Sequence, residues 1–123
     1  MDVALWVIQV LLALVFVMAG GMKLIQPKEK ISAMLPWAND FSQNNIRLIG
    51  LVEVLGAIGL ILPSLTRILP VLTPLAALGL VVTMVGAILT HLRRKETPAI
   101  AVNVVLLVLA AVVVYGRFVA VPL

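Results

Sequence analysis

The chain has 123 residues, of which 63% are hydrophobic and only 11% are charged, and its formal net charge is +4. Soluble domains are closer to half apolar and one quarter charged, so this composition excludes an ordinary soluble domain and indicates an integral membrane protein. A membrane-spanning helix needs about 20 apolar residues. The chain therefore has room for four spans with short connections, and none for a second, soluble domain.

Residue types that commonly carry redox cofactors are scarce. The absence of cysteine excludes disulfides, thiol redox chemistry and iron–sulfur ligation by this chain. His91 is the only histidine, which excludes a haem held by two histidines of one subunit. We expect no metal site, no catalytic residue and no covalently bound cofactor. The charges lie between the apolar runs rather than on a basic helix face, so we also expect no nucleic-acid partner.

Hydropathy predicts an all-α fold, a four-helix transmembrane bundle that forms a single domain over residues 1–123. The first span covers residues 3–22. One of its faces is small or polar, and we expect this face to point inward, because membrane helix interfaces use such residues. Its members are Gln9, Ala13, Phe16, Gly20 and Lys23. Asp2 precedes the span and no basic segment does, which disfavours a cleaved signal peptide.

Residues 23–45 form a longer connection. Pro27 suits the first position of a short helix, in which Ile31, Met34 and Leu35 share one face, and Pro36 would end it. Trp37 and Phe41 are aromatic residues of the kind found at membrane interfaces. We predict a short interfacial helix between spans one and two, with an irregular loop as the alternative.

The second span, residues 46–62, carries one carboxylate, Glu53, near its middle. An ionisable side chain at this depth costs about 2.5–3.5 kcal/mol on insertion scales. Glu53 is therefore expected to face the protein interior or a water-filled cavity, with a partner. Residues 63–67 are predicted to form a tight turn.

The third span covers residues 74–92, with Thr73 as its expected N-cap. Small residues recur on one face of this span, at Gly79, Thr83, Gly86 and Thr90. Such a stripe lets a neighbouring helix approach closely. Together with Gly20 of the first span, we expect it to pack against a helix of the same bundle or of a second subunit, so a homo-oligomer is one prediction.

The fourth span covers residues 98–114, with Thr97 as its expected N-cap. Asn103 lies little more than one turn inside this span, and Tyr115 and Arg117 are expected to mark the far interface. Most of the nine Lys and Arg residues follow spans one and three, and only Arg67 and Arg117 lie on the other side. The positive-inside rule then predicts both termini outside, in a bacterial inner (plasma) membrane.

With this topology, each span brings one polar residue to the cytoplasmic half of the bundle: Lys23, Glu53, His91 and Asn103. We interpret them as a pocket for the headgroup of a quinone or another amphipathic molecule, in which Glu53 and His91 bind it or exchange a proton with it. The alternative is structural. Glu53 would then fix helix register, Lys23 and His91 would lie at the headgroups, and Gln9 and Asn103 would form interhelical hydrogen bonds worth about 0.6–2 kcal/mol each.

The sequence resembles the DoxX-like family of small four-helix membrane proteins over nearly its whole length. The resemblance rests on residues 19–24, 50–63 and 84–88, and on His91 with the two residues after it. Lys23, Glu53 and His91 match the family pattern, which assigns them no established catalytic role. The resemblance implies membrane subunits of quinone-linked assemblies for some relatives, a complex with soluble redox enzymes for another, and assembly chaperones for distant ones.

We therefore predict an integral membrane subunit or binding module that is not catalytic on its own. It would offer a polar pocket for a quinone-like molecule to a redox partner, with membrane lipids around it. The alternative function is an assembly factor or scaffold for other membrane proteins, in which Glu53 would be structural. A proton-coupled transporter is disfavoured, because the two halves show no broken helices and no inverted repeat.

Overall fold

Four long helices account for most of the chain, and the computed structural model describes all of residues 1–123. They are α1 (Asp2–Ile25), α3 (Gln43–Thr66), α4 (Leu72–Arg94) and α5 (Thr97–Tyr115), which a π-helical turn, η2 (Gly116–Ala120), extends. All four are long and apolar enough to cross a membrane. A 24-residue helix is about 36 Å long and exceeds the ~30 Å hydrocarbon core. The predicted all-α, four-span fold is confirmed.

The connection between α1 and α3 holds two short elements, α2 (Lys28–Met34) and a 3-10 turn, η1 (Pro36–Asp40). The predicted short helix is thus partly confirmed, with Pro27 as its N-cap rather than its first residue. Ile31 is fully buried against Ala38 and Ile46, whereas Met34 is exposed. The segment is therefore anchored on the start of α3 through a small apolar cluster of its own.

Several helix ends differ from the predicted ones. α3 continues through Pro63 to Thr66, because neighbouring helices in a membrane bundle compensate for the hydrogen bond that a proline removes. The turn follows instead at Arg67, whose φ of 59° is left-handed. Thr73 lies inside α4 and does not cap it, because its hydroxyl donates to the Gly59 carbonyl oxygen of α3 (3.0 Å). Thr97 is the first residue of α5, and Glu96 takes the N-cap position.

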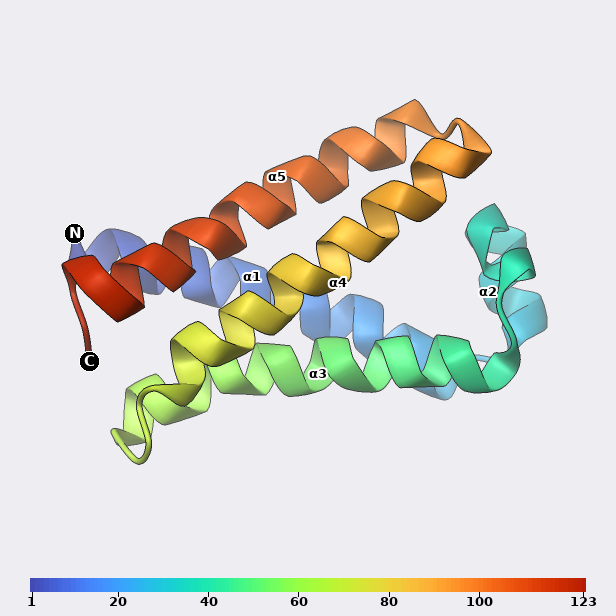
Figure 1. Cartoon of the computed structure of the whole chain (residues 1–123). Helices are drawn as coiled ribbons and strands as arrows, with labels where there is room; N and C mark the ends of the chain where they lie inside the picture. Colours follow the sequence, from blue (N-terminus) through green and yellow to red (C-terminus); the bar gives the residue numbers. More distant parts are fainter.

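The helices form a ring in which α1 lies beside α3, α3 beside α4, and α4 beside α5, with a smaller contact between α5 and α1. Figure 1 shows the pair α4–α5 diverging from the pair α1–α3 toward the end that carries α2, while both termini lie at the other end. The bundle is thus closed at the end of the termini and widens toward α2.

Glycines allow the close contacts on which this arrangement depends. A Cβ on Gly20 of α1 would lie 2.6 Å from the carbonyl oxygen of Gly50 of α3, so the two backbones touch. In α3, Gly56 packs against the side chain of Leu80 and Gly59 packs against Ala76, both of α4. The α3–α4 contact is therefore tight in the half of the bundle near the termini.

Candidate functional site

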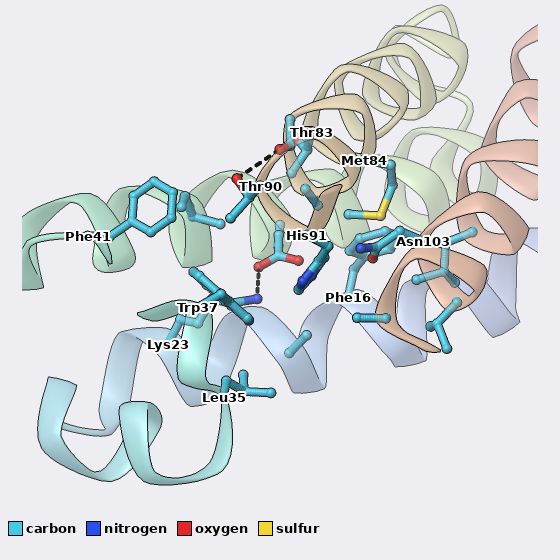
Figure 2. Close-up of a pocket in the computed structure, with 18 of the residues that line it drawn as sticks. Phe16, Lys23, Leu35, Trp37, Phe41, Thr83, Met84, Thr90, His91 and Asn103 are labelled. Atoms are coloured by element: carbon cyan, nitrogen blue, oxygen red, sulfur yellow. Dashed lines mark hydrogen bonds and ion pairs between the residues drawn. The ribbon is translucent and has the colours of Figure 1, made fainter. Parts of the chain in front are cut away.

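A cavity of about 840 Å³ occupies the wide end of the bundle, between the two diverging helix pairs. It is lined by residues of α1, η1, α3, α4 and α5, most of them hydrophobic (Figure 2). All four residues that the sequence marked as candidates line it: Lys23, Glu53, His91 and Asn103. Its size and its mostly apolar wall with a few convergent polar groups are typical of small-molecule sites.

Lys23 and Glu53 form a buried ion pair in this wall. The Lys23 Nζ atom lies 2.6 Å from Glu53 Oε1, and the two side chains are only 9% and 4% exposed. The same ammonium group lies 5.5 Å from the centre of the Trp37 ring, at cation–π distance. Glu53 Oε2 has no protein partner, and a lysine ammonium carries three donor hydrogens. The pair can therefore offer both an acceptor and a donor to a ligand.

His91 is held at the edge of the cavity by the corner between α4 and α5. Its Nδ1 atom lies 2.8 Å from Glu96 Oε1, and its ring meets Trp37 edge-on, with ring centres 6.4 Å apart. With Nδ1 as the donor to this carboxylate, Nε2 is left without a protein partner. Lys23 and His91 both lie against the Trp37 ring (Figure 2), so the two polar side chains share the end of the pocket at this ring.

Asn103 is the one residue of the pocket wall with a fully buried polar atom that has no hydrogen-bond partner. It is only 9% exposed, and its Nδ2 atom is buried without a hydrogen-bond partner. The interhelical hydrogen bond that the structural alternative required of Asn103 is absent. A buried donor without a partner costs about 1–3 kcal/mol, and an acceptor on a bound molecule would recover it.

Trp37 of η1 and Phe41, the residue that follows η1, close the end of the cavity. Trp37 and Phe41 line it and stack edge-to-face on each other, with ring centres 5.6 Å apart. The sequence did not predict this role, because the fold of residues 36–41 turns both rings toward the cavity, while their position at the membrane interface stays a prediction. Leu35 and Pro36 complete this cover.

The predicted small-residue stripe of α4 divides into two parts. Thr83, Gly86 and Thr90 line the cavity, whereas Gly79 does not. A Cβ on Gly79 or Gly86 would meet no atom within 4 Å, so neither packs against a helix of its own chain. A contact of this face with a second copy stays a prediction.

A second polar cluster, at the closed end, was not foreseen. Arg117 was expected at the interface, but it is only 3% exposed, because η2 turns it back into the bundle. Its Nε donates to Gln9 Oε1 (2.8 Å), and its Nη1 donates to Asp2 Oδ1 (2.7 Å). Gln9 Nε2 in turn donates to the Leu60 carbonyl oxygen (2.6 Å), which confirms the interhelical role expected for Gln9. The only signal in the sequence is the absence of proline between Tyr115 and Pro122, which allows the helix to continue and carry Arg117 inward.

Four membrane-spanning helices, closed at one end by this cluster and opened at the other around a buried ion pair, define a multi-pass membrane protein with an internal pocket. No group of three His, Cys, Asp or Glu side chains gathers in it. The model of the DoxX-like family matches residues 7–113, so the chain belongs to the DoxX-like family. Searches of curated proteins and of solved structures returned no match.

Proposed function

We propose that the pocket binds an amphipathic small molecule of the quinone class and that the chain serves as the membrane subunit that presents it to a redox partner. The observation that carries this proposal is Asn103, a buried donor without a partner in a cavity of about 840 Å³. A ring with carbonyl groups on opposite sides would accept hydrogen bonds from Asn103 Nδ2 at one end and from Lys23 Nζ at the other.

The remaining groups suit the reduced form of the same molecule. A quinol donates hydrogen bonds, and Glu53 Oε2 and His91 Nε2 are acceptors without protein partners. Donors and acceptors therefore stand side by side at the polar end of the pocket, which is what a ligand that gains and loses protons requires. The aromatic ring of Trp37 supplies a flat apolar surface beside them.

The redox partner follows from what the chain lacks and from its charge. The sequence has no cysteine and one histidine, so electrons would reside on the ligand and on another protein. Arg93, Arg94 and Lys95 lie at the wide end of the bundle, beside the pocket. With this end in the cytoplasm of a bacterium, as the positive-inside rule predicts, an acidic soluble enzyme could dock there.

The two tryptophans provide the test, because Trp37 lines the pocket and Trp6 lies at the closed end near Arg117. In detergent, a Trp6→Phe variant leaves Trp37 as the only reporter. We expect a tailless dimethoxy-methyl-benzoquinone to quench its fluorescence with saturation. Asn103→Leu, which keeps the size of the side chain but removes its amide, should weaken this binding about tenfold, since hydrogen bonds of this kind are worth about 1–1.5 kcal/mol.

The matched control is Trp37→Phe, in which Trp6 reports on the closed end. Quinone that merely dissolves in the micelle quenches both tryptophans in proportion to its concentration. Linear quenching of equal slope in the two variants would contradict the proposal, and so would unchanged affinity in Asn103→Leu.

A second function, that of a scaffold for other membrane proteins, is favoured by one observation. A Cβ on Gly79 or Gly86 of α4 would meet no atom within 4 Å, so this face leaves space for the close approach of a helix of a partner. If this second function is correct, a large side chain at Gly79 and one at Gly86 should each disrupt the complex with the partner protein to the same extent.

A further inference from the structure

The cavity reaches the surface of the bundle between α3 and α4, at the depth of the membrane. Leu48 and Val52 of α3 line it and are 59% and 40% exposed. Gly86 of α4 lines it as well, is exposed, and has no atom within 4 Å of the position of a Cβ. A pocket that is open at these three residues opens toward acyl chains.

Along the α3–α4 contact this opening is confined to one half. The cavity wall is also exposed at Val15 of α1 and Val102 of α5, where no glycine lines it. Nearer the termini, Gly56 and Gly59 of α3 bring the two helices into contact with Leu80 and Ala76. Toward α2 the helices separate, and Figure 1 shows α4 rising away from α3. The gap therefore begins about two turns beyond Leu80, at Gly86.

α4 presents a smooth wall along the gap. The Thr83 hydroxyl donates to the Gly79 carbonyl oxygen (2.9 Å), and the Thr90 hydroxyl donates to the Gly86 carbonyl oxygen (3.0 Å). Both hydroxyls are thus satisfied by their own helix. The wall beside Gly86 therefore has space and no unsatisfied polar group, so a hydrocarbon chain can lie against it.

The other end of the pocket is covered. Trp37 of η1 and Phe41, the residue that follows η1, lie across it, and the side chains of Lys23 and His91 lie against the Trp37 ring. Gly86 lies five residues before His91 on α4, about 7.5 Å nearer the middle of the helix. A molecule in the pocket thus has its polar part near His91 and its apolar part at the level of Gly86.

From this arrangement we propose that the ligand carries a hydrocarbon tail, that it comes from the bilayer rather than from water, and that its tail leaves the pocket between α3 and α4 past Gly86. This inference rests on the proposed function and names the ligand class more narrowly, as a lipid-soluble molecule with a chain too long for the cavity. The unpartnered Asn103 amide in the wall of the same cavity is the independent sign that the pocket suits a ligand with a hydrogen-bond acceptor.

The test uses two glycines that differ only in their relation to the pocket. Gly79 and Gly86 lie two turns apart on one face, each accepts a threonine hydroxyl, and each has open space at Cβ. Gly86→Phe should obstruct the gap, and Gly79→Phe should not. Both are made in the Trp6→Phe background and titrated with the tailless quinone and with its decyl derivative, and the Trp37→Phe variant corrects for quenching in the micelle.

We expect Gly86→Phe to lose at least tenfold in affinity for the decyl quinone and less than twofold for the tailless one, while Gly79→Phe binds both as the parent does. Gly86→Leu is the second variant if the larger side chain lowers the melting temperature. The inference is overturned if Gly86→Phe binds the decyl quinone normally, if it loses both probes, or if Gly79→Phe shows the same loss. If neither probe quenches Trp37 saturably in the parent, the proposed function fails first, and the inference falls with it.

Discussion

The ion pair between Lys23 and Glu53 allows a quantitative prediction about stability. Its side chains are 9% and 4% exposed and its atoms are 2.6 Å apart, so each charge depends on the other. Removing one partner of a buried pair costs about 3–5 kcal/mol, because the remaining charge is left in a medium of low polarity. Replacing both partners leaves no such charge and is often close to neutral.

For Glu53→Gln we expect a loss near the lower end, about 3 kcal/mol. The amide oxygen of glutamine still accepts a hydrogen bond from Lys23, and Lys23 lies in the last turn of α1, where its long stem can carry the ammonium toward the headgroups. The Trp37 ring at 5.5 Å also remains. Lys23→Met removes the partner of the carboxylate and should cost about the same, roughly 3 kcal/mol.

The double variant tests whether the two charges are coupled. If the pair is ionised and coupled, Lys23→Met/Glu53→Gln should cost about 1 kcal/mol rather than the 6 kcal/mol or so that independent sites would give. The assay is unfolding of the purified protein by increasing mole fractions of SDS in detergent micelles, followed by circular dichroism. A double variant whose loss equals the sum of the two single losses within about 0.5 kcal/mol would refute the reasoning.

Three further predictions use the same protein. Gly20→Ala should lower the free energy of unfolding by about 1–3 kcal/mol, because its Cβ would lie 2.6 Å from a carbonyl oxygen of α3. In the control variant Gly21→Ala the new Cβ meets no atom and the change should be neutral, so equal effects of the two variants would contradict the close contact. Arg117→Met should cost about 2–3 kcal/mol in SDS titration, since it removes charge-assisted hydrogen bonds to two helix-α1 side chains, and a neutral result would show that the closed end holds without them. Reporter fusions after Leu123 and within residues 28–40 should report the outside and the cytoplasm respectively, and a cytoplasmic C-terminus would reject the orientation.

Most of the fold could be predicted from the sequence, because the bilayer leaves few choices. Apolar runs of about 20 residues must become helices, since no water is present to bond their backbone groups. The inward face of α1 was also predictable: Gln9, Phe16, Gly20 and Lys23 are all buried. A polar side chain at membrane depth is expected to face the bundle interior, because exposure to acyl chains is costly.

The partner of Glu53 could be narrowed but not chosen from the sequence. Lys23, His91 and polar groups of the first and fourth helices were all within plausible reach. The choice depends on the way α1 and α3 meet at Gly20 and Gly50, and this crossing is a property of packing rather than of hydropathy. His91 pairs with Glu96 instead, because both residues lie at the corner between α4 and α5.

The parts that were missed all depend on segments near helix ends. Positive-inside counting treats every arginine as a surface charge, so it placed Arg117 at the interface, although a π-helical turn directs it inward to Gln9. The place of Trp37 in the cavity wall could not be predicted either, because hydropathy gives no information on how residues 36–41 fold over the end of the pocket. Only the three-dimensional fold of these short elements sets the direction of their side chains.

The account's central claim is that the cavity holds a lipid-soluble molecule of the quinone class. Native mass spectrometry of the protein, gently solubilised from its own membrane, tests this most directly. The matched variants are Ala87→Phe, which places a ring in the cavity wall, and Ala111→Phe, which lies on the exposed face of α5 outside it. We predict a quinone adduct on the parent and on Ala111→Phe, and none on Ala87→Phe. Phospholipid adducts alone, or the same quinone adduct on both variants, would contradict the claim.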